Sequence, residues 1–211
     1  VGGYRSSQTD ADGMTATRTL TPPRKTYIPG ELGIWTFITG DLALFSFFFV
    51  LFLQYRSRQL ALFTESQSHL NQTLGLVNTL LMLSSSWLVA SAVQAARREQ
   101  PEFAARCFAS AFGCGAGFVV VKYFEYSAKI RAGFTPTSND FFMYYYVYTG
   151  IHLIHVTIGM GVLAILVAYT RSTRRGASIS IQHLESGATF WHLVDLLWIV
   201  LFALLYLVGQ S

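Results

Sequence analysis

Histidine and aspartate recur at helical spacing inside stretches that are otherwise apolar. "YTGIHLIHVTIG" carries His152 and His155, and "TFWHLVDLLW" carries His192 and Asp195. Each pair is spaced i, i+3, so its two side chains share one face of a helix. Neutral imidazoles can ligate a metal or a haem iron. One helical turn supplies too few ligands, so hydrogen bonds between packed helices are favoured for the first pair. The local pattern leaves the second pair open between holding a proton or a partner and satisfying itself.

Two carboxylates raise the same question. Asp41 in "FITGDLALF" lies near the middle of an apolar segment, where a carboxylate must be paired, hydrogen-bonded or protonated. A proton-linked or lipid-headgroup site and an internal hydrogen bond between helices both fit it. Glu125 in "VKYFEYSAKI" follows Lys122 by three residues and precedes Lys129 by four, so it can pair with either lysine. A self-contained ion cluster is favoured there over a catalytic carboxylate.

Membrane-spanning helices must position these groups. The 211 residues are 52% hydrophobic, 15% aromatic and 12% charged, whereas soluble domains carry about 25% charged residues. A bilayer is crossed by about 20 mostly apolar residues. Five segments reach that length, namely 32–53, 74–96, 104–126, 144–170 and 189–208. We therefore expect an all-α membrane protein, a bundle of five transmembrane helices forming one transmembrane domain over residues 31–211.

Basic residues predict how the bundle is oriented. Ten lie on the side of the N-terminal segment and five on the other side. This bias predicts a cytoplasmic N-terminus and an external C-terminus. Residues 1–30 have no apolar core and are expected to form a flexible cytoplasmic tail. The net charge of +4 is spread between the apolar blocks, so the sequence gives little support for nucleic-acid binding.

Small residues recur every four positions in the third segment, at Ala109, Gly113 and Gly117. Such a stripe lets a second helix backbone approach closely. Packing within this chain is favoured over contact with another subunit, and both remain open.

Four blocks, taken together and in order, resemble subunit III of the haem–copper respiratory oxidases. They are "GIWTFITGDLALF", "YFEYSAKI", "GIHLIHVTIG" and "WHLVDLLWIVLF". Five spans also resemble the shorter members of that family. By motif match, Asp41 takes the position of the family's membrane-embedded carboxylate. The other matched polar residues are Glu125, His152, His155, His192 and Asp195.

The resemblance implies a non-catalytic accessory subunit in a bacterial inner (cell) membrane. Such a subunit has no catalytic residue, metal or redox cofactor of its own. Its implied partner is a catalytic haem–copper subunit of the subunit I type, which would hold the haem and the copper or iron. Bound phospholipid is expected in a cleft between helices. The implied role is to stabilise the catalytic subunit and to support electron transport and proton uptake.

Two positions depart from the family pattern. Asp41 stands where the family usually has Glu, and Lys122 stands where it typically has Gln. "PGELGIWTFITGDLALF" together with "NQTLGLVNTLLMLSSS" is more similar to the accessory branch associated with nitric oxide reductases, and we favour that branch over a standard oxidase.

Two other functions stay open. One is a membrane redox protein whose haem is held by His152, His155 and His192. The other is an independent proton-coupled transporter built around Asp41. The shortage of clustered ligands counts against the first, and the absence of internal sequence repeats counts against the second.

Overall fold

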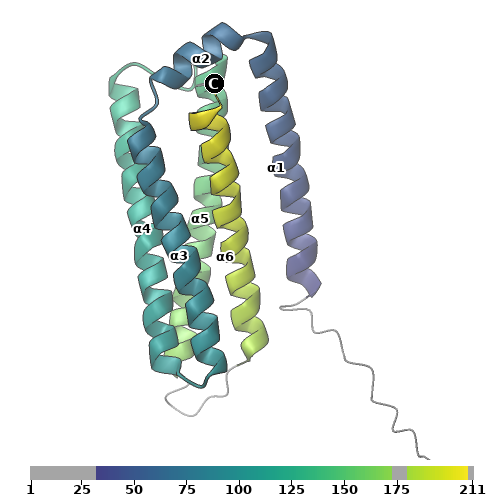
Figure 1. Ribbon diagram of the computed structural model, residues 1–211, viewed down its shortest axis with the longest axis vertical. Helices are drawn as coiled ribbons and strands as arrows, with labels where there is room; N and C mark the ends of the chain where they lie inside the picture. The colour runs from purple at the N-terminus through teal and green to yellow at the C-terminus, as the bar shows by residue number, and fades with distance from the viewer. Residues whose placement is uncertain (1–31, 173–179, 209–211) are drawn as a thin grey trace, which may run out of the picture.

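Long helices that run side by side make up the part of the chain described by the computed structural model, residues 32–172 and 180–208 (Figure 1). The long helices are α1 (Leu32–Arg58), α3 (Gln72–Arg97), α4 (Pro101–Arg131), α5 (Asp140–Ser172) and α6 (Ile181–Phe202). A π-helical turn, η2 (Ala203–Leu207), continues α6, and the short helix α2 (Leu60–Ser68) joins α1 to α3. Within the described ranges, five helices are long and apolar enough to cross a membrane. The predicted all-α, five-helix class is confirmed.

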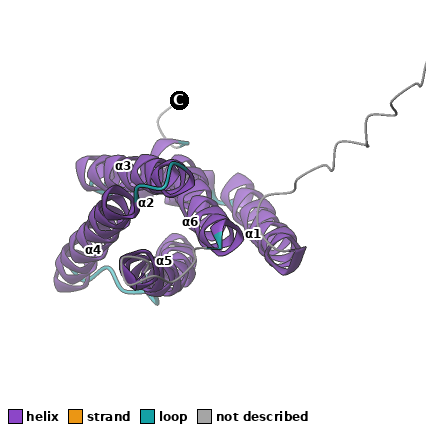
Figure 2. Cartoon of the chain, turned by 90° about the horizontal axis from the view of Figure 1, so that it is seen from below, coloured by secondary structure: helices purple, strands orange, loops and turns teal. Residues whose placement is uncertain are grey.

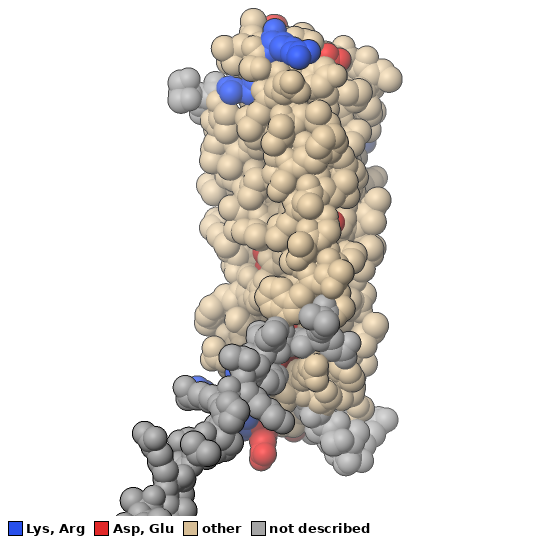
Figure 3. Space-filling view, turned by 90° about the vertical axis from the view of Figure 1, so that its right-hand side faces the viewer, with Lys and Arg blue, Asp and Glu red and all other residues tan. Residues whose placement is uncertain are grey.

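Two predictions about this architecture remain untested. The expected tail at residues 1–30 lies outside the described residues, and so does most of the connection between α5 and α6. The orientation of the termini stays a prediction. On the face shown in Figure 3, Lys and Arg gather at the two ends of the bundle, with a broad belt between them that is almost free of charge.

The helices extend beyond the apolar segments that predicted them, because polar residues cap them outside the apolar stretch. Asn71 Oδ1 accepts a hydrogen bond from the Leu74 backbone N–H at 3.2 Å and caps α3. Asn139 Oδ1 does the same for Phe142 at the start of α5, at 2.9 Å. Pro101 opens α4, where its missing N–H costs nothing. After α4 the chain turns at Gly133, whose φ of 86° is one that glycine adopts freely.

Helix α6 is the centre of the bundle. Figure 2 shows it between α3 and α5, with α1 on its remaining side. The two tryptophans of α6, Trp191 and Trp198, are fully buried. Trp198 Nε1 donates to Thr79 Oγ1 of α3 at 3.1 Å, so even the polar atom of this large side chain has a partner inside the bundle.

The ring of Trp191 lies in a slot made by two glycines. A Cβ atom added to Gly159 of α5 would come within 2.7 Å of Trp191 Cε3, and one added to Gly115 of α4 within 3.0 Å of Trp191 Cη2. Trp191 Nε1 donates to Ser85 Oγ of α3 at 2.9 Å, and that hydroxyl donates to the Ala111 carbonyl of α4 at 3.1 Å. One indole ring therefore contacts α3, α4 and α5 together.

Only part of the small-residue stripe predicted on α4 packs against a neighbouring helix. A Cβ at Gly117 would make ordinary contact with Leu81 at 3.4 Å, whereas one at Gly113 would meet nothing within 4 Å. Ala109 is half-buried. Of the three glycines in α4, Gly115, which lies between two members of the stripe, packs most tightly against other helices.

Helix α1 joins the bundle mainly through large aromatic side chains. Phe48 stacks on Tyr148 with ring centroids 5.5 Å apart, and the Tyr148 hydroxyl donates to the Phe48 carbonyl at 2.7 Å. Phe45 meets the His155 ring edge-on at 5.6 Å. The opposite side of α1 stays exposed, with Val50 at 62%. Such an apolar outer face is what a lipid-facing helix requires.

We expect Gly159→Ala to lower the free energy of unfolding by about 1–3 kcal/mol, because its methyl group would overlap the Trp191 ring. Gly161→Ala is the matched control in the same helix, since an added Cβ there meets nothing within 4 Å. Reversible unfolding in mixed detergent micelles, followed by circular dichroism, measures both variants. Equal stabilities for the two would show that the slot does not hold α5 against α6.

Candidate functional site

A buried ion cluster lies where α4, α5 and η2 meet. Lys122 Nζ donates to Glu125 Oε2 at 2.9 Å, and each side chain is only 2% exposed. The Tyr206 hydroxyl accepts from Lys122 Nζ at 3.0 Å and donates to Glu125 Oε1 at 2.6 Å. The ammonium group also lies 4.8 Å from the ring centroid of Trp198 and 5.2 Å from that of Tyr145, which is cation–π distance. Each charge in the cluster is thus met by an opposite charge or a ring face.

Lys129, the second lysine that Glu125 could have paired with, is engaged elsewhere. Its Nζ donates to the His69 carbonyl at the end of α2, at 3.0 Å. That bond ties α4 to the connection between α2 and α3, and it leaves Lys122 as the hydrogen-bonded lysine partner of Glu125. The role of Glu125 in function stays a prediction.

The π-helical turn η2 brings Tyr206 to this cluster. A π turn widens the helix and frees carbonyl groups from their usual partners. Gln67 Nε2 of α2 donates to the Leu205 carbonyl at 3.2 Å, and Gln72 Nε2 of α3 donates to the Tyr206 carbonyl at 3.1 Å. The two glutamines therefore stabilise the turn. Sequence reasoning missed Tyr206 and its supports, because hydropathy does not distinguish a π turn from the end of an α-helix.

Asp41 and His155 form a second buried contact, between α1 and α5. His155 Nε2 lies 3.1 Å from Asp41 Oδ1, and His155 Nδ1 lies 2.9 Å from the Ile151 carbonyl oxygen. A carbonyl only accepts, so Nδ1 must carry hydrogen. The contact at Nε2 then needs one further proton, on either the imidazole or the carboxyl group. The pair therefore shares one proton whichever group holds it.

The second carboxyl oxygen of Asp41, Oδ2, is buried and has no hydrogen-bond partner within the described part of the chain. The residue as a whole is only 8% exposed. Asp41 also lines a shallow groove with Thr36 and Gly40. Both interpretations drawn from the sequence stay open, because the carboxylate holds two helices together and also borders a surface.

The other motif histidines have different neighbours. His152 is fully buried against the rings of Phe118 and Trp198, at centroid distances of 5.7 and 5.4 Å. His192 Nδ1 lies 2.7 Å from Ser86 Oγ of α3 and 3.9 Å from Asp195 Oδ2. Asp195 is buried and His192 is partly exposed. Within residues 32–172 and 180–208, no group of three His, Cys, Asp or Glu side chains converges to hold a metal ion.

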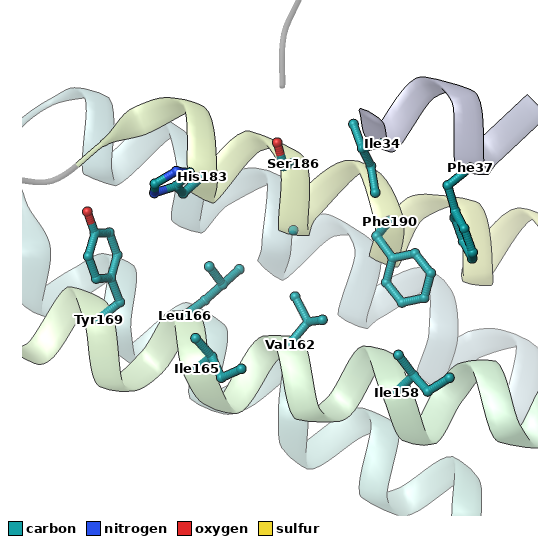
Figure 4. A pocket seen from close by; sticks show the side chains of 11 residues that line it. Ile34, Phe37, Ile158, Val162, Ile165, Leu166, Tyr169, His183, Ser186 and Phe190 are labelled. Carbon is teal, nitrogen blue, oxygen red and sulfur yellow. The ribbon is translucent and has the colours of Figure 1, made fainter. Parts of the chain in front are cut away.

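An apolar pocket of about 530 Å³ lies between α1, α5 and α6 (Figure 4). Its wall includes Phe37 of α1, Val162 of α5 and Phe190 of α6. Tyr169 and His183 stand together at one end, so the pocket has a polar end and an apolar body. Sequence reasoning could not locate it, since its lining comes from three helices far apart in the chain.

Five long apolar helices that enclose a set of buried polar groups define a multi-pass membrane protein. The family model described as "Cytochrome c oxidase subunit III" matches residues 28–210. The chain therefore belongs to the cytochrome c oxidase subunit III family.

Similar chains carry two kinds of oxidase name. The "Cytochrome c oxidase subunit 3" of Synechocystis sp. is 31% identical, over 92% of this chain and 87% of its own length. The protein of the same name from Bacillus sp. strain PS3 is 24% identical, over 90% and 92% respectively. The "Probable quinol oxidase subunit 3" of Staphylococcus haemolyticus is 25% identical, over 85% and 89%.

We expect Lys122→Met to lower the free energy of unfolding by about 3–5 kcal/mol, because it leaves Glu125 as a buried charge without its cation. The double variant Lys122→Met/Glu125→Gln should regain most of that loss, since no lone charge remains. The same unfolding measurement in micelles, arranged as a double-mutant cycle, gives the coupling between the two residues. Additive losses would mean that the two side chains do not stabilise each other.

Proposed function

We propose that this chain is a non-catalytic accessory subunit of a bacterial respiratory haem–copper complex in the inner membrane. It would bind beside a haem-bearing catalytic subunit of the subunit I type and stabilise it. One observation carries this: similarity to subunit 3 chains extends over 85–92% of the sequence, and those relatives are named for two different electron donors. A chain that fits both names is suited to a role that does not depend on the donor.

The pairing of charged side chains favours a structural role for this chain over a catalytic one. Lys122 and Glu125 neutralise each other inside the bundle. At the end of α3, Arg97, whose side chain is 53% exposed, forms an ion pair with the buried Glu185 of α6 at 2.5 Å. Charges within a membrane span are costly unless they are paired. In these two contacts the charges are used to join helices, so they favour a rigid body against which a larger subunit could pack.

The pocket between α1, α5 and α6 fits a bound phospholipid acyl chain. Its body is lined by Ile158, Val162 and Phe190, and its polar end by Tyr169 and His183. A lipid there would fill the space beside α1, which otherwise depends on a few aromatic contacts. These features support the expected phospholipid.

Nitric oxide reductase remains a second candidate for the host complex. The observation that favours it is the similarity of "PGELGIWTFITGDLALF" and "NQTLGLVNTLLMLSSS" to that branch, and the departures at Asp41 and Lys122 count against a standard oxidase. Both substituted residues are buried and hydrogen-bonded, so the bundle accommodates them structurally.

The haem-binding alternative requires His152, His155 and His192 to meet around one iron. His155 instead contacts Asp41 and His192 contacts Ser86, while His152 lies against Phe118 and Trp198. A transporter built on Asp41 alone has no supporting observation beyond the carboxylate itself.

Affinity purification from native membranes in mild detergent tests the proposal. We expect the tagged chain to co-purify with a larger polypeptide that accounts for the haem absorption, because His152, His155 and His192 do not converge on one point in the described part of the chain. The variants His152→Ala, His155→Ala and His192→Ala should each leave the haem content of the catalytic polypeptide unchanged. Oxygen and nitric oxide consumption by the same preparation separates the two candidate hosts. Stoichiometric haem on the isolated chain, lost in these variants, would refute the proposal.

We further expect Asp41→Asn to leave assembly intact but to slow proton uptake by the complex or shorten its active lifetime severalfold. Asparagine can bond to His155 but cannot hold the proton that the pair shares. Asp41→Glu is the control, since it restores an acid at the same position. Turnover-linked proton uptake and the decay of activity during turnover measure the effect, beside the yield of complex. Normal values in Asp41→Asn would mean that the carboxyl group has only a structural role.

A further inference from the structure

A groove between α3 and α4 carries two arginines whose guanidinium groups bind no other side chain in the described part of the chain. The groove encloses about 450 Å³ and shares no residue with the pocket between α1, α5 and α6. Arg98 stands at the end of α3 and Arg106 in the second turn of α4, and both are exposed. Their neighbour Arg97, by contrast, is paired with Glu185.

The groove is charged at the end of the bundle and apolar further in. Gln94 and Gln100 line it beside the two arginines, whereas Trp87 lines it deeper in α3. Trp87 is 70% exposed and Phe103, on the facing wall, is 54% exposed. From Arg98 to Trp87 the groove follows α3 for about 16 Å at 1.5 Å per residue. That is about half of a hydrocarbon core of ~30 Å, which is the depth of one lipid leaflet.

Two glutamates lie close to these arginines in the sequence but outside the groove. Glu99 and Glu102 belong to the same turn region, and neither lines the groove. Glu102 borders a separate recess of about 250 Å³, which it shares with Arg106 and Arg171. The second recess thus holds one carboxylate beside two arginines, one of which also lines the groove.

We propose that this groove binds an anionic phospholipid. The phosphate is held by the guanidinium groups of Arg98 and Arg106, which suit phosphate because they donate two parallel hydrogen bonds. The acyl chain follows the groove toward Trp87. Basic pockets between transmembrane helices at a membrane surface have this ligand chemistry. A carboxylate from a partner protein would use only the charged end, whereas a lipid matches both the charge and the apolar length.

The test compares anionic with zwitterionic lipid on the purified full-length chain in detergent. Native mass spectrometry titrates phosphatidylglycerol and phosphatidylcholine against the wild type and Arg98→Gln/Arg106→Gln. We expect the double variant to lose about 30-fold in affinity for phosphatidylglycerol and little for phosphatidylcholine, at about fivefold for each basic residue. The control Arg58→Gln/Arg131→Gln removes the same charge from exposed arginines at the other end of the bundle. It should bind both lipids like the wild type.

A second measurement places the acyl chain. Phosphatidylglycerol brominated on its acyl chains should quench tryptophan fluorescence in the wild type, and Trp87→Phe should remove the part of the quenching that depends on the headgroup. Unchanged phosphatidylglycerol affinity in Arg98→Gln/Arg106→Gln, or headgroup-dependent quenching that persists in Trp87→Phe, would overturn the proposal. Displacement of the lipid by millimolar inorganic phosphate would also contradict the proposal, because it would show that the site binds only the anionic headgroup. Loss of the catalytic subunit from the double variant, with lipid binding intact, would assign the groove to a protein partner instead.

Discussion

The contact of the Trp191 ring with Gly115 and Gly159 fixes the spacing of the bundle. Neither glycine can gain a methyl group without the ring moving, so α4 and α5 approach α6 at a distance set by the thickness of the indole. The register between α3 and α6 follows from the same place. Ser85 bonds to Trp191, Ser86 to His192 and Thr79 to Trp198, so consecutive turns of two antiparallel helices are matched. In lipid, packing and hydrogen bonds of this kind hold helices together, because there is no water to expel.

The register between α3 and α6 also determines which side chains surround the embedded charges. It brings Tyr206 to Lys122 and Glu125, and the resulting cluster is closed by hydrogen bonds and aromatic rings. Removing water makes an unpaired charge costly, and a satisfied polar network in the same place holds the helices in a single arrangement. The motif residues on α4 and α6 therefore indicate the family and explain the packing of the helices. They do not by themselves indicate a chemical reaction.

The sequence was sufficient for the helices and for the family, because hydropathy over 20 residues and four ordered motifs are long-range signals. It could not choose between Lys122 and Lys129 as the partner of Glu125, since both spacings are helical. It indicated a stripe at Ala109, Gly113 and Gly117, whereas the glycine of α4 that packs most tightly against other helices is Gly115. Periodicity marks a face but does not say which neighbour that face meets. Helix α2 and the π turn were missed because one is too short for a hydropathy window and the other depends on Gln67 and Gln72, which lie far away in the sequence.

Asp41 differs physically from the closed cluster around Glu125. Its Oδ1 contacts His155, while its buried Oδ2 has no bonded partner among the described residues. Aspartate is one methylene shorter than glutamate, so the carboxyl group stays close to its own helix and His155 must reach across to it. His155 can do so because Ile151 holds its other nitrogen as a donor. Asp41 thus differs from Glu125: one of its oxygens contacts an imidazole on another helix, and the other is a buried acceptor without a bonded partner in the described part of the chain.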